Sequence, residues 1–437
     1  MPVNQPEASD RSADRRLVWI GALALMLGLS VTVYRIVTDY QTPGPFTPDR
    51  QGLCDFHNGI YYPARATMAG ESPYSEAYAA KNPVARQIPF FSPVILWLHA
   101  PFAILPLRVA EVLHTVWQIA VLIGIAIVSC RAAGWGRRFD VVLLVSAAIV
   151  WTRAGHVTLF NGYFTFELVL ATFLALRWAD QKPWAAGWML VIVSAKPTYI
   201  LPLGFLMLAR GNGRAIVIGA VFSVIAAAAS LGWIAYHEGN GDLSTGFGLL
   251  ADQVVQTQEV HRAMEDESPV HSWTRLDLFA IIAKWAGRDP GDLPHLFVMF
   301  AVLVMPMWVL WCRRQRSIDD GITGLTGGLV MTTMLVSLYH QSYDALLVVP
   351  PILGLIGGLA AGDKLKDQPT LGRPIRIALI VLMGWPLVNY LSTRMFLLRW
   401  DLSETTTKIL ASLNGISLAF ALVVLTYVAY RETIRRR

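Results

Sequence analysis

Long apolar runs separated by short polar strings dominate this chain from end to end. The first run covers about residues 17–36, and no small-residue cleavage site follows it, so we interpret it as a retained span. Runs of roughly 17–25 apolar residues suit helices that cross the hydrocarbon of a bilayer, where the backbone must satisfy its own hydrogen bonds. Further runs lie near residues 109–129, 140–153, 164–178, 184–209, 215–235, 293–312, 321–338, 344–361, 375–391 and 409–430.

Prolines modify this pattern at two places. The stretch 88–107 contains four prolines, and we predict a broken span or a re-entrant hairpin there. The run 184–209 is read as two short helices with a turn at Lys196-Pro197, because proline disfavours a continuous helix. The sequence thus predicts an all-α polytopic bundle of about twelve spans, with one domain over residues 17–437 and both termini in the cytoplasm.

Composition and charge agree with a membrane protein. Of the 437 residues 54% are hydrophobic and 15% charged, whereas soluble domains carry about 25% charged residues. The net charge of +6 does not indicate a nucleic-acid partner, because the basic residues cluster in short strings between apolar runs, as the positive-inside rule places them. These strings include Arg131, Arg137, Arg138, Arg313, Arg314, Arg316 and Arg435 to Arg437. Residues 1–16 are expected to be a disordered cytoplasmic tail.

Two long loops, about 37–87 and 236–292, then fall on the extracytoplasmic side of the plasma (inner) membrane and form the predicted active-site face. Residues 56–68 suit a short amphipathic helix lying on the membrane. Asp55 precedes this segment. It is either a helix N-cap, a position that aspartate favours, or a catalytic base at the lipid–water boundary.

A second polar group is the turn from Tyr339 to Asp344, which joins two apolar runs. It is either a loop with an N-cap at Asp344 or a pocket for a phosphate or sugar, with His340 as a donor. Lys196 interrupts an apolar run, and charges at membrane depth normally face a cavity or a partner. Its alternatives are a snorkelling lysine and a lysine that grips a lipid-linked phosphate.

Other candidates are individually weaker. Arg153 and Arg275 are helix-end anchors or further phosphate contacts, and Glu111 and Glu167 are buried structural acids or ion-coupling groups. The three cysteines predict neither a disulfide framework nor a zinc site. The chain has no Walker loop, dinucleotide fingerprint, HExxH or Asp-x-Asp string, so we expect no cofactor and no metal in the reaction.

The order of these landmarks resembles that of the polytopic glycosyltransferases of the GT-C class, most closely glycosyltransferase family 87. The matching motifs are Asp55-Phe56 with Gly70-Glu71-Ser72-Pro73-Tyr74, Pro93, Asn161-Gly162, Arg177-Trp178, Lys196-Pro197 and the turn at His340 to Asp344. Two departures bear on the donor or acceptor rather than the class. Leu159-Phe160-Asn161-Gly162 stands where many members have Gly-Gln-x-Asn, and Phe90-Phe91-Ser92-Pro93 where Tyr-Pro-Pro is common.

The resemblance implies a reaction. The family transfers sugar, most often mannose, from a polyprenyl-phosphate donor at the outer face of the membrane, with inversion and an aspartate base, which corresponds to Asp55. The acceptor would be a hydroxyl of a glycolipid or glycan. We assign the donor phosphate to Lys196, His340, Arg275 and Arg153. We expect substrate contacts from His57, Arg65, Tyr74, Asn161, Tyr343 and Asp344.

Three alternatives stay open at this stage. The sugar could be arabinofuranose, since the family includes an arabinofuranosyltransferase. The chain could instead be a lipid or sugar transporter, in which Lys196, Glu111 and Glu167 would serve ion coupling. Transporters often contain internal repeats, however, and this sequence shows none. A membrane scaffold would leave the polar turn at His340 to Asp344 unexplained.

Overall fold

The computed structural model describes residues 14–45, 47, 50–85, 91–136, 138–262, 264, 267–360 and 371–435. Within these ranges every regular element is a helix, and β pairing is limited to three isolated bridges. The first half contains α1 (Arg15–Thr38), η1 (Phe56–Tyr61), α2 (Tyr62–Met68), α3 (Glu76–Lys81), α4 (Val94–Leu98), α5 (Ala100–Ala103), α6 (Leu107–Ala132), α7 (Phe139–Trp151), α8 (Arg153–Asn161), α9 (Thr165–Trp178), α10 (Pro183–Val193) and α11 (Pro197–Arg210). The second half contains α12 (Gly213–Glu238), α13 (Leu243–Arg262), α14 (Leu278–Ala286), α15 (Asp292–Gln315), α16 (Leu325–Ser337), η2 (Ser342–Val348), α17 (Val349–Ala360), α18 (Arg373–Val388), α19 (Arg394–Arg399) and α20 (Glu404–Arg435).

Six helical stretches in the described residues are long and apolar enough to cross a membrane. They are α1, α6, α12, α15, η2 with α17, and α20, and a seventh results if α7 and α8, bent by 73°, form one span. These helices fit an all-α, multi-pass membrane protein, as the sequence predicts. The count of about twelve spans stays a prediction, because the remaining helices are either shorter than a bilayer requires or, like the 20-residue α13, not apolar enough.

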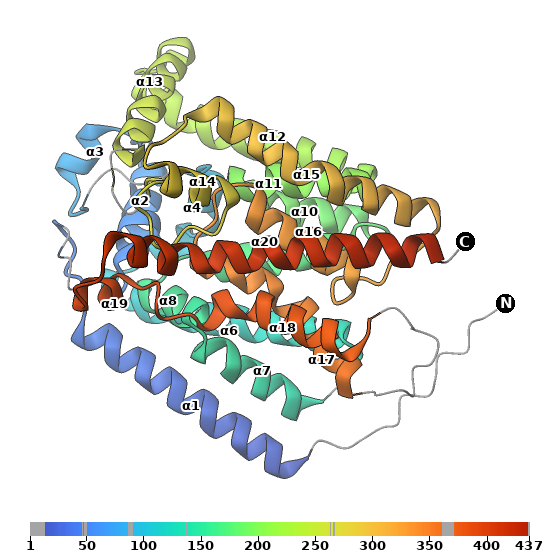
Figure 1. The fold of residues 1–437 in the computed structure, drawn as a ribbon. Coiled ribbons are helices and arrows are strands. Elements are labelled where there is room, and N and C mark those ends of the chain that lie inside the picture. Colours follow the sequence, from blue (N-terminus) through green and yellow to red (C-terminus); the bar gives the residue numbers. More distant parts are fainter. Residues whose placement is uncertain are drawn as a thin grey trace.

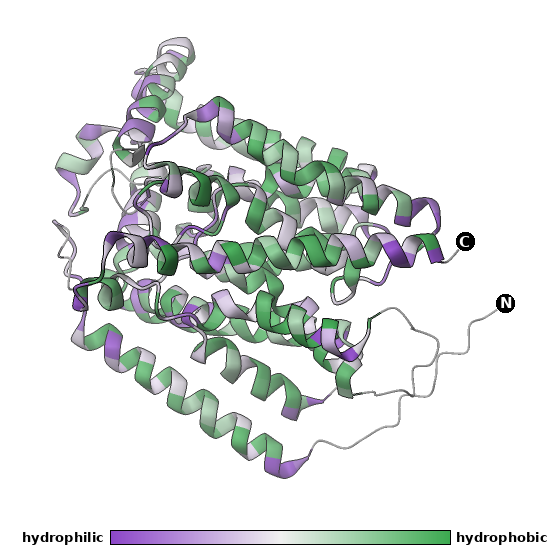
Figure 2. Cartoon of the chain, viewed as in Figure 1, coloured by the Kyte–Doolittle hydropathy of each residue, from purple (hydrophilic) through white to green (hydrophobic). Residues whose placement is uncertain are grey.

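The two ends of the bundle differ (Figure 1). The start of α1 and the end of α20 lie at one end, whereas α2, α3, α13 and α19 gather at the other. Hydrophobic residues cover the long helices, and hydrophilic residues concentrate at the ends (Figure 2). The two long loops of the sequence therefore contribute to the same end, which lies opposite the start of α1 and the end of α20.

Small residues allow α1 to approach α7 closely. A Cβ atom added to Gly21 would lie 2.9 Å from Leu143 Cβ, and one added to Gly28 would lie 2.9 Å from Val150 Cγ1. Trp19 and Leu23 on the same helix are 75% and 65% exposed, so the rest of α1 faces outward. Without a hydrophobic force between helices in lipid, close packing of this kind holds a peripheral span in place.

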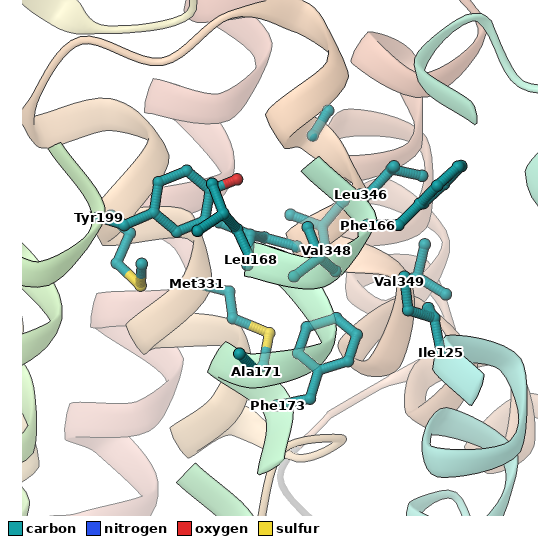
Figure 3. Packing of buried hydrophobic residues seen from close by; sticks show 14 of the residues in the cluster. Ile125, Phe166, Leu168, Ala171, Phe173, Tyr199, Met331, Leu346, Val348 and Val349 are labelled. Carbon is teal, nitrogen blue, oxygen red and sulfur yellow. The ribbon is translucent and has the colours of Figure 1, made fainter. Parts of the chain in front are cut away.

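The core of the bundle lies around α9 and α16. All thirteen residues of α16 are buried, so this helix is enclosed by protein on every side. Figure 3 shows part of this core, with labelled side chains from α6, α9, α11, α16, η2 and α17. The polar turn at Tyr339 to Asp344 directly follows α16, so its position is fixed by the most enclosed helix of the protein.

The local predictions fare differently. The break in 184–209 is confirmed, because α10 ends at Val193 and α11 begins at Pro197. The segment 88–107, where it is described, forms only the short helices α4 and α5, whose nine residues extend about 14 Å and are too short to cross a bilayer. Most of the predicted tail, residues 1–16, lies outside the described residues, and Arg15 and Arg16 already belong to α1.

The helix expected at residues 56–68 is present as η1 and α2, but its surface position is not confirmed. Every residue of η1 is buried, and in α2 only Arg65 is exposed. Aromatic side chains beside a membrane loop suit either lipid or a protein interior, and here the protein interior encloses them. The segment therefore packs inside the bundle instead of presenting one free apolar face.

An ion network around the buried Arg313 joins the ends of α15 and α20. Arg313, 1% exposed, donates to Glu432 Oε2 at 2.8 Å and to Asp320 Oδ2 at 3.1 Å. We expect Arg313→Ala to lower the free energy of unfolding by about 3–5 kcal/mol, because it leaves the buried Glu432 carboxylate without this partner. Arg314→Ala, a neighbouring exposed position, should change it by less than about 0.5 kcal/mol in the same denaturation assay. Equal effects of the two changes would contradict the assigned role.

Candidate functional site

Lys196 and Asp344, far apart in the chain, form a buried ion pair. Lys196 caps the start of α11, and its Nζ lies 3.3 and 3.1 Å from the two carboxylate oxygens of Asp344. Asp344 also accepts hydrogen bonds from the Tyr199 hydroxyl at 2.8 Å and from the backbone N–H of Gln341 at 2.9 Å. Asp344 is thus more than a turn residue, because it fixes the lysine ammonium at the break between α10 and α11.

Three tyrosine rings surround this ammonium. Lys196 Nζ is 5.9, 5.2 and 5.3 Å from the ring centroids of Tyr163, Tyr199 and Tyr343. Ring faces attract a cation, and the attraction grows where water is excluded. Phe91 extends the aromatic wall by contacting the Tyr163 ring. The result is a cationic centre inside an aromatic wall.

The segment that carries Asp55 is anchored to the end of α8. The Leu53 N–H donates to the Phe160 carbonyl at 2.8 Å, and Leu53 has a φ of 61°, which is a strained value for a bulky residue. Asn58 secures the following turn, since its side chain bonds the Cys54 carbonyl and the Ala85 N–H, each at 2.8 Å. Backbone strain held by its surroundings in this way is common at functional sites.

Asp55 itself is half-buried and does not act as an N-cap. It has helical backbone angles, makes no side-chain capping bond, and leads into the π-helix η1, a helix type that is frequent at functional sites. The Cys54 Sγ lies 3.6 Å from its Oδ1. The pKa of the Tyr163 phenol is raised well above its ordinary value, first by loss of water around it and then by the charges of Asp55 and Asp344. Asp55 and the Lys196–Asp344 pair therefore act on the same ring.

His340 and Arg275 lie beside this centre but are already engaged. The His340 Nδ1 bonds the Leu338 carbonyl at 3.0 Å, and its Nε2 is buried without a partner. Burial lowers the pKa of His340, so the neutral ring offers a lone pair at Nε2. Arg275 makes two hydrogen bonds to Asp277, of 2.9 and 3.0 Å, and lies 4.8 Å from the Tyr339 ring. A bridge between Arg275 and Gln341 joins the second long loop to the polar turn.

The remaining candidates serve other contacts. Arg153 is buried and donates to the Asn389 carbonyl and the Ser392 side chain, at 3.0 and 2.6 Å. Tyr74 donates to the Phe91 carbonyl at 2.9 Å and thereby supports the aromatic wall.

The surroundings of the last three candidates, His57, Arg65 and Asn161, differ from one another. The buried His57 Nε2 lies 2.8 Å from Glu111 Oε1. Arg65 is exposed over the Tyr61 ring, and the Oδ1 of Asn161 is buried without a hydrogen-bond partner.

Comparison with known proteins decides the family. A sequence profile of glycosyltransferase family 87 matches residues 90–350, which is more than half of the chain. The chain belongs to glycosyltransferase family 87. No curated protein and no solved structure matches it. Family membership makes this protein a membrane glycosyltransferase and gives it a sugar donor and an acceptor as substrates.

Two of the three tyrosines around Lys196, Tyr163 and Tyr199, were missed in the sequence, whereas Tyr343 was expected as a substrate contact. Tyr163 directly follows Asn161-Gly162, and Tyr199 lies one helical turn after Lys196. Their closeness in sequence to these two motifs is the signal that could have identified them. Among the described residues, one group of ligand-type side chains is close enough to hold a metal ion. It consists of His99, His114 and Glu167, and none of its members contributes to the Lys196–Asp344 pair.

Gly162 offers a test of how the Asp55 segment is positioned in this family 87 enzyme. It ends α8 with a φ of 73°, and an added Cβ would lie 2.8 Å from Phe56 Cβ. We expect Gly162→Ala to cost about 1–2 kcal/mol for the left-handed backbone and to displace the Asp55 segment, so that kcat falls more than stability alone explains. Gly134→Ala, at a φ of 77° with nothing within 4 Å, is the matched control. Similar kcat values for the two variants would show that the contact with Phe56 does not matter.

Proposed function

We propose that this enzyme transfers mannose from a polyprenyl-phosphate donor to a hydroxyl of a glycolipid or glycan at the extracytoplasmic face. The observation that carries the proposal concerns Tyr163: the charge of the half-buried Asp55 carboxylate contributes to the raised pKa of its phenol, and the buried Lys196 ammonium lies 5.9 Å from its ring centroid. A carboxylate suits the acceptor hydroxyl, and an ammonium suits the phosphate that leaves.

The reaction is written as a single displacement. The acceptor oxygen attacks the anomeric carbon and forms the new glycosidic bond, while its proton passes to an Asp55 carboxylate oxygen. The bond between the anomeric carbon and the phosphate oxygen breaks, and its electron pair stays on the polyprenyl phosphate. Attack from the face opposite the leaving group inverts the anomeric centre. A base of this kind contributes about 10²–10⁴-fold to the rate.

We assign to Lys196 the stabilisation of the negative charge that develops on the leaving phosphate. An ammonium has three N–H donors, so Lys196 can keep a bond to Asp344 and still donate to a phosphate oxygen. Arg275 and Arg153 are proposed as secondary phosphate contacts, each sharing a guanidinium with its protein partners. Neutral His340 is a hydrogen-bond acceptor at Nε2, so a sugar hydroxyl suits this atom better than a phosphate.

His57, Arg65, Tyr74, Asn161 and Tyr343 complete the proposed substrate-binding face. Asn161 and His57 offer buried polar atoms without hydrogen-bond partners, Oδ1 and Nδ1, that a sugar could use. Arg65 is exposed and suits an anionic acceptor. Tyr343 contributes a ring of the Lys196 enclosure, and Tyr74 supports Phe91 from behind.

For the topology, we propose that α9, α10, α11, α16 and α18 form five further, shortened spans of the plasma membrane in addition to the seven apolar spans, with the outer end of α10 lying within the bilayer. This gives about twelve crossings and places both termini in the cytoplasm, in agreement with the basic strings. Reporter fusions after Arg138, Thr198 and Tyr343 test this arrangement. A cytoplasmic signal from the fusion at Tyr343 would remove the polar turn from the active face and contradict the proposal.

The transfer itself is tested in membranes that contain the chain and a radiolabelled polyprenyl-phosphate mannose. Labelled glycolipid or glycan that depends on expression of the chain supports the proposal. Transfer from polyprenyl-phosphate arabinofuranose alone would correct the proposed sugar and support the proposed type of reaction. Absence of transfer from both donors, with label moved across the membrane unchanged, would replace the enzyme by a transporter.

A further inference from the structure

Three buried side chains of types that bind metals come together beside Phe56, the residue that follows Asp55. One ligand atom from each of His99, His114 and Glu167 lies within 4.8 Å of the others. They come from three separate places: the junction between α4 and α5, the first third of α6, and the first turn of α9. We propose that these three residues hold a zinc ion that fastens these elements together. This site is distinct from the proposed transfer chemistry.

The surroundings of His99 and Glu167 are those of metal ligands. His99 Nδ1 bonds the Ile95 carbonyl at 2.8 Å, which directs Nε2 to Glu167, 3.2 Å from each carboxylate oxygen. Metal-bound histidines usually donate their other N–H to a backbone carbonyl in this way. Glu167 Oε1 accepts from Trp117 Nε1 at 2.5 Å and from Gln118 Nε2 at 3.0 Å, as ligating carboxylates commonly do.

A proton alone accounts for this cluster less well than a metal ion. A proton shared by His99 and Glu167 would pair those two groups, but it would leave His114 Nδ1 buried without a hydrogen bond, while His114 Nε2 lies 3.3 Å from the Gln118 side-chain nitrogen. A divalent ion can accept a lone pair from each of the three residues and balances the buried carboxylate. Two ligands of a tetrahedral zinc at about 2.0–2.1 Å lie about 3.3 Å apart, close to the observed His99–Glu167 separation.

The donor set selects the metal. Two imidazoles and one carboxylate form a set of three protein ligands that zinc accepts, leaving a fourth position for water. Phe56 stacks on the His114 ring with centroids 4.4 Å apart, and Phe102 meets the same ring edge-on at 5.4 Å. Because Phe56 follows Asp55 in the chain, a zinc ion here would fix the ring on which the Asp55 segment rests.

The experiment measures zinc in the full-length protein, purified in detergent with an affinity tag that lacks histidine. After loading with zinc chloride and exhaustive dialysis, elemental analysis should find about equimolar zinc. His114→Gln and Glu167→Gln should reduce it to background. His156→Gln and Glu111→Gln make the same exchanges at buried positions outside the cluster and should retain the metal.

A milder variant protects the test against misfolding. Trp117→Phe removes the N–H that holds Glu167 while keeping an aromatic ring at this 44% exposed position, and it should weaken zinc affinity about 10–100-fold. Wild-type protein without zinc after loading, or equal zinc in all variants, would overturn the proposal. These readouts do not depend on sugar transfer, so failure of the proposed reaction and failure of the metal site are distinguishable.

Discussion

Asp55→Asn should abolish sugar transfer while the protein still accumulates and folds. The amide keeps the size of the carboxylate but cannot take the proton of the acceptor hydroxyl, so we expect kcat to fall by about 10²–10⁴-fold. The Michaelis constant for the donor should change little, because the loss concerns an interaction formed as the new bond forms. The measurement is transfer from radiolabelled polyprenyl-phosphate mannose in membranes with matched amounts of protein.

The control for this change is another carboxylate in the same part of the chain. Asp39 follows α1, is partly exposed and pairs with Arg35 at 3.7 Å. Asp39→Asn should transfer sugar at close to the native rate. Native rates for Asp55→Asn would refute Asp55 as the base and direct attention to Asp344.

The second large effect concerns the Lys196–Asp344 pair. Lys196→Met leaves Asp344 buried and without its cation, and loss of one partner of a buried pair costs about 3–5 kcal/mol. We expect a marked fall in unfolding stability together with loss of transfer. Asp344→Asn should lower stability by a similar amount, because it leaves a buried ammonium without its carboxylate.

The double variant separates the structural role of Lys196 from its proposed role toward phosphate. Lys196→Met with Asp344→Asn removes both charges, so much of the stability should return, measured by denaturation in detergent. Transfer should not return, since no ammonium is left for the leaving phosphate. Recovery of transfer together with stability would show that Lys196 serves the fold alone.

The sequence predicted the local features of this site well. Proline at position 197 disfavours helical backbone at the residue before it and is well suited to the first position of a helix, so the break before α11 follows. Asp55, Lys196 and Asp344 each stood out because polar groups are costly beside apolar runs. Their pairing could not be predicted, because Lys196 and Asp344 are 148 residues apart and only the packing of α11 against η2 and α16 brings them together.

Burial was the main source of error. A hydrophobic or aromatic residue in a membrane protein can face lipid or protein, and its sequence is the same in both cases. Phe56 and Tyr61 were therefore expected at the membrane surface and lie inside the bundle. For the same reason, Tyr163 and Tyr199 were not recognised as walls of a charged site. The cluster of His99, His114 and Glu167 was not predicted either, because its members lie in separate segments of the chain.

The unequal lengths of α10 and α12 bear on how a lipid substrate is held. The two helices pack together and begin at the same end, but α10 has 11 residues and α12 has 26, which correspond to about 16 and 39 Å. Lys196 follows α10 and so lies about 20 Å short of the far end of α12. A donor phosphate bound there would be drawn below the headgroup layer, with its polyprenyl chain remaining in the hydrocarbon. The donor would then stay in the bilayer throughout the reaction, and the acceptor hydroxyl would have to enter the protein to the depth of Lys196.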